Sequence, residues 1–252
     1  MAETMKNMSE KKVVLLTGST GGLGIWIAKG LALKGYHLAL HYHSDESQAI
    51  TLKESLENSQ KHKIFAADLS EESQIKKMIA AVITQFGRID IVINNAGKSF
   101  SGMSWKQSAD DWNTIMNVNV TAVFLVNKYV IPYLREQNNG RIINISSIVA
   151  NRPLVGTSAY AASKAALEGF TRAQAIELSK FGITANCIAP GYFNTGMING
   201  LDSQTQENLI REIPSGRFGN PEELVECIVY LCSEFSAYMT GQVIALNGGL
   251  YL

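Results

Sequence analysis

The chain has 252 residues, of which 46% are hydrophobic and 17% charged, and its 22 basic residues balance 22 acidic ones. This composition is typical of a globular protein and excludes a disordered chain and a fibrous repeat. A net charge of zero with scattered basic residues gives no field that would attract nucleic acid or an anionic membrane surface. The start of the chain has no apolar stretch long enough for a signal peptide or a membrane span, so we expect a cytoplasmic protein.

The three cysteines predict reduced, buried thiols. Their number is odd, their neighbours are apolar, and Cys187, Cys227 and Cys232 lack the close spacing of a metal-binding motif. We therefore expect a reducing environment and no metal site.

Short apolar runs alternate with helical patterns along the chain. The runs that predict strands are residues 13–17, 37–42, 63–67, 89–94, 141–146, 184–189 and 242–246. Helical periodicity covers residues 23–34, 46–58, 71–86, 109–137 and 157–181. Strands that are apolar throughout are buried on both faces, which indicates a parallel sheet with helices on each side. The predicted fold class is α/β, a Rossmann-type doubly wound parallel sheet of about seven strands.

The chain has no Pro/Ser-rich linker, so we expect a single domain over residues 13–252 after a flexible N-terminal extension of residues 1–12. Residues 190–220 interrupt the alternation, because prolines and glycines surround one short helical pattern near 203–212. We expect this segment to form a lid. The following helix begins at Asn220 as its cap, with Pro221 in its first turn.

A glycine-rich loop follows the first predicted strand and opens the first helix. Gly18, Gly22 and Gly24 have the spacing G-x-x-x-G-x-G. Glycine lets the backbone approach a pyrophosphate, and the free N–H groups of a helix start favour anionic oxygens. The loop therefore predicts a dinucleotide-binding site, although a tight turn remains the simpler alternative for glycines alone.

The end of the second predicted strand bears on the choice of cofactor. Dinucleotide folds that bind the ribose 2'-hydroxyl place an acid there, whereas this chain has Tyr42, His43 and Ser44. The missing carboxylate permits the 2'-phosphate of NADPH, and His43 adds partial charge. The alternative is that Ser44 and Asp45 only cap the next helix.

Four polar residues point to proton transfer at a carbonyl. Tyr160 and Lys164 lie four positions apart on one helical face, and Ser147 ends the fifth predicted strand, at the sheet edge that lines the cofactor crevice. Tyr160 can donate a proton to the reduced oxygen, Lys164 is expected to lower the pKa of that phenol, and Ser147 can hold the oxygen. Asn119 lies in the long helix and is expected to bind a proton-returning water, or else to distort the helix.

The motifs resemble the short-chain dehydrogenase/reductase family from Val13 to Leu252. The residues that carry the resemblance are Thr17–Gly24, Asp68, Leu69, Asn94–Gly97, Asn119, Ser147, Tyr160, Lys164, Pro190, Gly191 and Thr195. It implies a catalytic set of Asn119, Ser147, Tyr160 and Lys164. With the loop and strand-end residues above, it implies a cofactor site of Gly18, Ser19, Thr20, Gly22, Leu23, Gly24, Tyr42, His43, Ser44, Asp68, Leu69, Asn95, Ala96, Gly97, Tyr160, Lys164, Pro190, Gly191 and Thr195.

Within this family, residues 213–221 and 240–252 are similar to bacterial 3-oxoacyl-[acyl-carrier-protein] reductases and acetoacetyl-CoA reductases. The resemblance implies an NADPH-dependent oxidoreductase of fatty acid biosynthesis that reduces the 3-keto group of an acyl thioester, with acyl carrier protein as a possible partner. Lys98–Ser101 stands where these enzymes often have Ile-Thr-Arg-Asp, and Gly21 replaces a basic residue of the loop. Asn138 and Phe181 replace the basic residues that dock the carrier, although Arg135 and Lys180 lie close by.

Three alternatives therefore stay open. NADH is possible as cofactor, and the substrate could be another small ketone or alcohol, such as a sugar, a steroid, a pteridine-like compound or a xenobiotic. A nucleotide-binding regulator without turnover is the alternative outside enzymes.

The resemblance also implies a homotetramer whose subunits pair through the helices 109–137 and 157–181 and the tail 246–252. Both helices carry more apolar residues than one buried face requires. These residues are Val123, Phe124, Val126, Tyr129, Val130, Tyr133, Leu167, Phe170, Ala173, Ala175 and Ile176.

Overall fold

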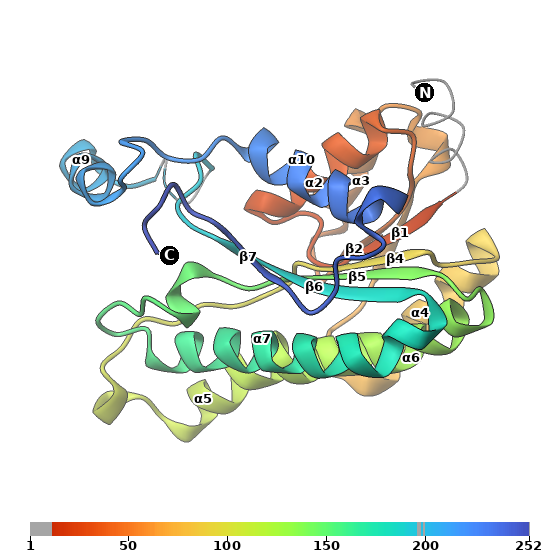
Figure 1. The fold of residues 1–252 in the computed structure, drawn as a ribbon, viewed down its shortest axis with the longest axis horizontal. Helices are drawn as coiled ribbons and strands as arrows, with labels where there is room; N and C mark the ends of the chain where they lie inside the picture. The colour runs from red at the N-terminus through yellow and green to blue at the C-terminus, as the bar shows by residue number, and fades with distance from the viewer. Residues whose placement is uncertain (1–11, 196–197, 199, 252) are drawn as a thin grey trace.

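The computed structural model describes residues 12–195, 198 and 200–251, and its strands form one parallel sheet (Figure 1). The strands are β1 (Val13–Leu16), β2 (His37–Tyr42), β3 (Lys63–Ala66), β4 (Ile91–Asn94), β5 (Gly140–Ile145), β6 (Ile183–Pro190) and β7 (Val243–Leu246). Their order is β3-β2-β1-β4-β5-β6-β7. The prediction of a single α/β domain with a doubly wound, seven-stranded parallel sheet is confirmed. The predicted extension of residues 1–12 lies, except for Lys12, outside the described residues.

Helices cover both faces of this sheet. The α-helices are α2 (Gly22–Leu33), α3 (Glu46–Ser55), α4 (Glu72–Phe86), α5 (Ala109–Met116), α6 (Ala122–Glu136), α7 (Ser158–Leu178), α9 (Ser203–Glu212) and α10 (Pro221–Cys232). Short 3-10 turns are Ser59–Lys61, Ser104–Lys106, Ile148–Ala150, Ser179–Phe181 and Glu234–Ser236. One hydrophobic core lies between the sheet and α2, α3 and α10, and the other lies beneath α4, α6 and α7 (Figure 1).

The long predicted helix 109–137 is continuous but not uniform. A π-helical turn, Asn117–Thr121, joins α5 to α6, and the buried Asn119 lies within it. Such turns widen a helix locally and occur frequently at functional sites. The segment Ala109–Glu136 is long and apolar enough to cross a membrane by composition. Several of its apolar side chains, among them Leu125, Val126 and Val130, however, form part of the core beneath the sheet.

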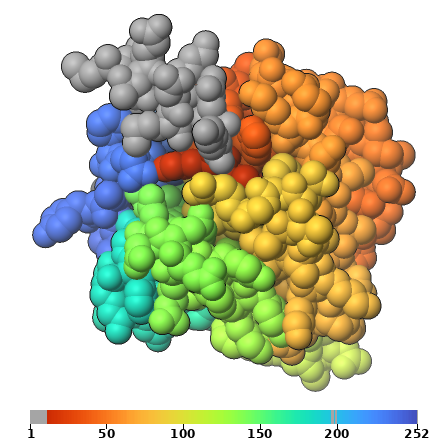
Figure 2. All heavy atoms as spheres, turned by 90° about the vertical axis from the view of Figure 1, so that its right-hand side faces the viewer, coloured from red at the N-terminus to blue at the C-terminus, as the bar shows by residue number. Residues whose placement is uncertain are grey.

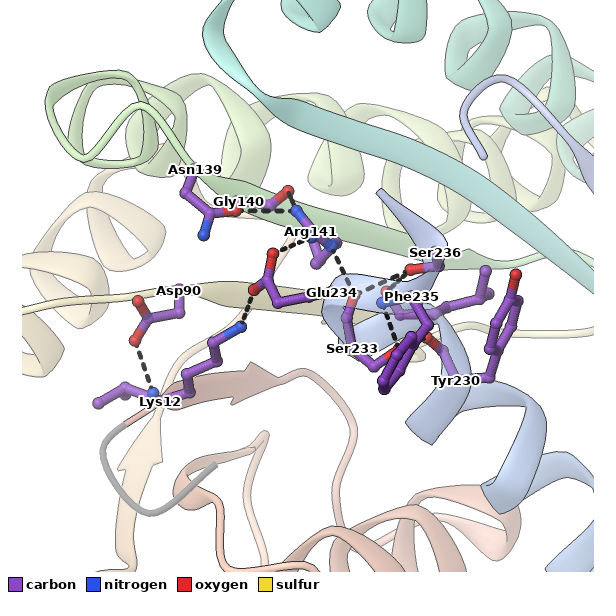
Figure 3. A network of polar contacts seen from close by, with 12 residues as sticks. Lys12, Asp90, Asn139, Gly140, Arg141, Tyr230, Ser233, Glu234, Phe235 and Ser236 are labelled. Atoms are coloured by element: carbon purple, nitrogen blue, oxygen red, sulfur yellow. Dashed lines mark hydrogen bonds and ion pairs between the residues drawn. The ribbon is translucent and has the colours of Figure 1, made fainter. Parts of the chain in front are cut away.

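The amino ends of the strands are joined by an ion-pair network (Figure 3). The Arg141 guanidinium on β5 is 3% exposed and donates to the Glu234 carboxylate at 3.1 Å and to the Ser233 carbonyl at 3.2 Å. Lys12 also pairs with Glu234. In the space-filling view of this end, red atoms of the N-terminal part of the described chain lie between orange and yellow segments on one side and blue segments on the other (Figure 2). The network therefore fastens the end of α10 to the sheet, far from the opposite edge where the glycine loop lies.

The segment 190–220 leaves the sheet after β6 and packs against the start of α7. Phe193 pairs with Gly219, and a small apolar cluster brings Ile213 and Leu250 together with Ile148 and Tyr160. The segment and the C-terminal tail thus border the predicted catalytic residues. Residues 196, 197 and 199 of the predicted lid lie outside the described part, and lid motion stays a prediction.

Candidate active site

A cleft of 1180 Å³ lies at the carboxyl ends of the central strands. Loops after β1, β4, β5 and β6 line it, as expected for a doubly wound sheet. Most residues predicted from the sequence are brought together here: Gly18, Thr20, Gly22, Leu23, His43, Asp68, Leu69, Asn95, Ala96, Gly97, Ser147, Tyr160, Lys164, Pro190, Gly191 and Thr195. Among the described residues, no group of three or more His, Cys, Asp or Glu could hold a metal ion.

The glycine loop is built so that only glycine fits at two positions. Gly18 has a φ of +62°, and a Cβ there would lie 2.8 Å from Ala96 Cα. A Cβ at Gly24 would lie 2.2 Å from the Gly18 carbonyl oxygen, so the first turn of α2 could not rest on the loop. The loop therefore presents bare backbone at the start of α2, which is the cradle that a pyrophosphate requires.

The loop after β4 is tied directly to the glycine loop. Asn95 donates from Nδ2 to the carbonyl oxygens of Thr17 at 3.1 Å and Gly18 at 2.9 Å. In return, the Thr17 hydroxyl accepts the backbone N–H groups of Asn95 and Ala96. The predicted Asn95 thus holds the shape of the cleft with its side chain, which is bound to the backbone of the glycine loop.

His41 is a functional residue that the sequence analysis missed. It is 2% exposed, and its Nδ1 accepts the Gly18 backbone N–H at 3.0 Å while Nε2 lies 3.0 Å from the Ala67 carbonyl. Burial lowers the pKa of His41 to about 4, so the ring is neutral and can accept this bond. Ser19, predicted to contact the cofactor, is fully buried and donates from Oγ to the His41 carbonyl. The only sequence signal was a polar residue within an apolar strand.

The structure separates the three residues expected to face the adenosine ribose. Side chains alternate along β2, so His41 and His43 line the cleft, whereas Tyr42 is buried and, like Ser44, does not. Asp45, and not Ser44, caps α3 by accepting the Gln48 N–H. His43 Nδ1 lies 3.9 Å from an Asp68 carboxylate oxygen. Of these three residues, only His43 lines the cleft.

Lys164 and Tyr160 lie on one side of α7 and face the cleft. The Lys164 Nζ is 5.7 Å from the centre of the Tyr160 ring and donates to the Ile145 carbonyl at 2.8 Å. The Lys164 side chain is almost fully buried, and this burial lowers its pKa to about 8. The Ile145 carbonyl at the end of β5 thus holds the Lys164 ammonium, with its lowered pKa, beside the Tyr160 phenol.

Ser147 completes the group from the end of β5. Its hydroxyl accepts the Val149 N–H at 3.3 Å, and its hydrogen bond with Tyr160 acts to lower the pKa of that phenol. Burial outweighs this bond and raises the pKa of Tyr160 above its usual value of 10. That Lys164, together with the charge of a bound nicotinamide, lowers this pKa stays a prediction. A neutral phenol at neutral pH is the form that donates a proton.

Asn119 acts here through hydrogen bonds to the chain. Its Oδ1 accepts the Lys98 N–H at 2.8 Å, and its Nδ2 donates to the Lys98 carbonyl at 2.8 Å and to Ser163 Oγ at 2.9 Å. The π-helical turn thus fastens the loop after β4 to α7, one residue from Lys164. Of the two roles that the sequence analysis gives Asn119, the structure shows the helix distortion, because the residue lies in the π-helical turn. Its binding of a proton-returning water stays a prediction.

Polar side chains beneath the cleft form a network, of which the sequence analysis named only Asn94. Asn94 donates to Asn127 and Asn144 at 2.9 and 2.8 Å, and Asn144 donates to Thr171 at 2.8 Å. These buried amides join β4 and β5 to α6 and α7. Buried polar networks of this kind specify one arrangement of the elements they join.

This fold and this cleft define a dinucleotide-dependent oxidoreductase, and comparison with known proteins identifies its family. The family model described as "Enoyl-(Acyl carrier protein) reductase" matches residues 18–251. The chain belongs to the short-chain dehydrogenase/reductase family.

Curated relatives match over nearly the whole chain. The 3-oxoacyl-[acyl-carrier-protein] reductase FabG of Thermotoga maritima is 37% identical over 243 residues, which are 96% of this chain and 99% of the relative. Enzymes of the same name from Vibrio cholerae and Staphylococcus aureus are 33% and 32% identical. They cover 96% and 97% of this chain and 98% and 100% of their own length, respectively.

Proposed function

We propose that this chain is an NADPH-dependent 3-oxoacyl-[acyl-carrier-protein] reductase that reduces the 3-keto group of an acyl thioester to a hydroxyl. The single observation that carries the proposal is the convergence of Ser147, Tyr160 and Lys164 at the cleft. The names and coverage of the curated relatives support the same substrate class. A nucleotide-binding regulator without turnover, the alternative outside enzymes, would not require a buried lysine beside a buried phenol.

The cofactor site fits a nicotinamide dinucleotide. The cradle of Gly18 and Gly24 would hold the pyrophosphate, His43 and Asp68 would lie at the adenosine end, and Thr195 would lie at the nicotinamide end. When bound, the cofactor supplies a hydride. The chain's own residues then bind and protonate the substrate: Ser147 holds the keto oxygen by a hydrogen bond, and Tyr160 donates its hydroxyl proton to that oxygen.

An absorbance assay tests the activity. Purified protein is mixed with acetoacetyl-CoA, and oxidation of NADPH or NADH is followed by the loss of near-ultraviolet absorbance. We expect turnover with NADPH to exceed turnover with NADH. If the protein did not reduce acetoacetyl-CoA but did reduce another small ketone, the proposed thioester substrate would be wrong. The substrate would then belong to the alternative class of small ketones and alcohols.

Activity should depend on pH through Lys164. The Lys164 pKa of about 8 lies below its unfolded value, so the free enzyme carries the ammonium below pH 8 and loses it above. Tyr160 stays neutral throughout this range because burial raises its pKa. We expect kcat/KM for the keto substrate to be level between about pH 6 and 7.5 and to fall above about pH 8. A profile that remains level to about pH 9.5 would exclude this role of the ammonium.

Cofactor preference should depend on His43. Replacing His43 with Asp puts a second carboxylate near Asp68, where it would repel the 2'-phosphate of NADPH and leave NADH unaffected. We expect the Kd for NADPH to rise about tenfold, measured by quenching of protein fluorescence, with the uncharged variant His43→Asn as control. Equal effects on NADPH and NADH would place His43 away from the 2'-position.

The proposed assembly is a homotetramer in the cytoplasm, with acyl carrier protein as the carrier of the substrate. Phe124 on α6 and Ile176 on α7 are 47% and 80% exposed, which supports a subunit contact across these helices. Other residues expected at that contact, Val123, Val126, Val130, Leu167 and Ala175, are instead buried within the chain. Tail residue Leu250 is also covered within the chain.

A further inference from the structure

A buried carboxylate outside the predicted catalytic set lies one helical turn beyond Lys164. Glu168 is 3% exposed, on the same side of α7 as Tyr160 and Lys164. In the described part of the chain, no lysine, arginine or histidine lies within ion-pair distance of it. A buried carboxylate without a cation is costly unless hydrogen bonds compensate it.

The hydrogen bonds that compensate Glu168 come from both sides of Ser147. Ser146 donates from Oγ to Glu168 Oε1 at 2.9 Å, with the Lys164 carbonyl as a longer second acceptor at 3.3 Å. Asn151 donates from Nδ2 to the two carboxylate oxygens at 3.3 and 3.2 Å. The carboxylate therefore fixes the residue before Ser147 and the residue four positions after it.

This arrangement joins the segment 145–151 to α7 around the reacting groups. The Ile145 carbonyl accepts a hydrogen bond from the Lys164 ammonium, and the Ser146 hydroxyl donates one to Glu168. The turn Ile148–Ala150 follows Ser147 directly. If Glu168 lost its acceptor oxygens, Ser147 would keep its side chain but lose its fixed position against Tyr160. A displacement of about 1 Å in a positioning group can cost about a hundredfold in rate.

We infer that Glu168 is a positioning residue for the reduction, which holds Ser147 in place through Ser146 and Asn151. The inference rests on the proposed function, because it assumes that Ser147 binds the reacting carbonyl. Glu168 itself does not contact the substrate or the cofactor. Glu168 acts through Ser147. The effect of replacing Glu168 on kcat should therefore depend on whether Ser147 is present, whereas the effect of replacing a merely structural residue should not.

A double-mutant cycle tests the inference. Glu168→Gln keeps the shape of the side chain, but its amide N–H₂ opposes the donors Ser146 and Asn151. We expect kcat with acetoacetyl-CoA to fall between about tenfold and a hundredfold, with the Kd for NADPH unchanged. In the Ser147→Ala background, Glu168→Gln should lower kcat by less than about twofold, because the Ser147 hydroxyl that Glu168 positions is already absent. An equal fold-loss in both backgrounds would overturn the inference.

Controls separate positioning from folding. Glu177→Gln changes an exposed carboxylate on the same helix and should leave kcat unchanged. If Glu168→Gln does not fold, the exposed Asn151→Ala replaces it in the cycle, with a smaller loss expected in the wild-type background and none with Ser147→Ala.

Hydrogen exchange gives a readout that requires no turnover. The amides of residues 146–152 should exchange faster in Glu168→Gln, or in Asn151→Ala, than in Glu177→Gln. Unchanged exchange would overturn the inference whatever the substrate is. A wild type that reduces no ketone would refute the proposed function, while the exchange experiment would still decide whether Glu168 holds this segment.

Discussion

Replacing Tyr160 with Phe is expected to lower kcat by about 10²- to 10⁴-fold while leaving cofactor binding intact. The ring packs against the apolar cluster of Ile148, Val149, Ile213 and Leu250, and phenylalanine would keep this packing. Only the hydroxyl is lost, and with it the proton for the keto oxygen and the bond to Ser147. Steady-state kinetics with acetoacetyl-CoA and a fluorescence titration with NADPH measure the two effects. A variant within a few-fold of the wild type would remove Tyr160 from the mechanism.

Replacing Lys164 with Met should have opposite effects on activity and stability. Activity is expected to fall about 10²- to 10³-fold, because the buried positive charge beside Tyr160 is lost. NADPH binding should weaken as well if the ammonium contacts the bound cofactor. Initial rates and the same fluorescence titration measure these two losses, and full activity in the variant would contradict the role.

Stability should increase in the same variant at neutral pH. The Lys164 pKa of about 8, against about 10.4 in the unfolded chain, means that this lysine costs about 3 kcal/mol of stability below pH 8. The cost decreases as the pH rises from about 8 and disappears near pH 10.4. Methionine fills the space, although it leaves the Ile145 carbonyl without its donor at a cost of about 1 kcal/mol. Urea unfolding at pH 7 and near pH 10 should show this gain and its loss; a less stable variant at pH 7 would contradict the pKa assignment.

The sequence predicts the layers of the fold well because buried parallel strands and amphipathic helices leave clear periodic patterns. Boundaries are less certain where tertiary contacts decide them. The predicted helix 46–58 ends at Ser55, because the backbone becomes extended at Leu56, and the left-handed Asn58 then precedes a 3-10 turn. Similarly, the last residues of the predicted helix 157–181 form a 3-10 turn before Gly182. The π-helical turn at Asn119 is fixed by Lys98 and Ser163, which are distant in sequence and give no local signal.

The site illustrates the same limit. Tyr160, Lys164 and Ser147 can be found because spacing and strand ends bring them to one edge. The roles of Tyr42 and His43 depend on which face each presents, and an apolar run buried on both faces does not reveal this. His41 and Glu168 support the cleft by bonds to backbone and to other side chains, so their residue types alone do not predict them. Similarly, apolar residues of α6 and α7 could not be divided between the core and a subunit contact until the packing was known.

The most direct test of the account follows the hydride to its product. The protein is given NADPH that carries deuterium at the transferable position, with acetoacetyl-CoA and crotonyl-CoA together in equal amounts. The account predicts 3-hydroxybutyryl-CoA with deuterium at C3, and at least about a hundredfold less label in the Tyr160→Phe reaction over the same time. Deuterium in butyryl-CoA would show reduction of the enoyl bond instead, as in the description of the matching family model, and would contradict the assignment to the keto group.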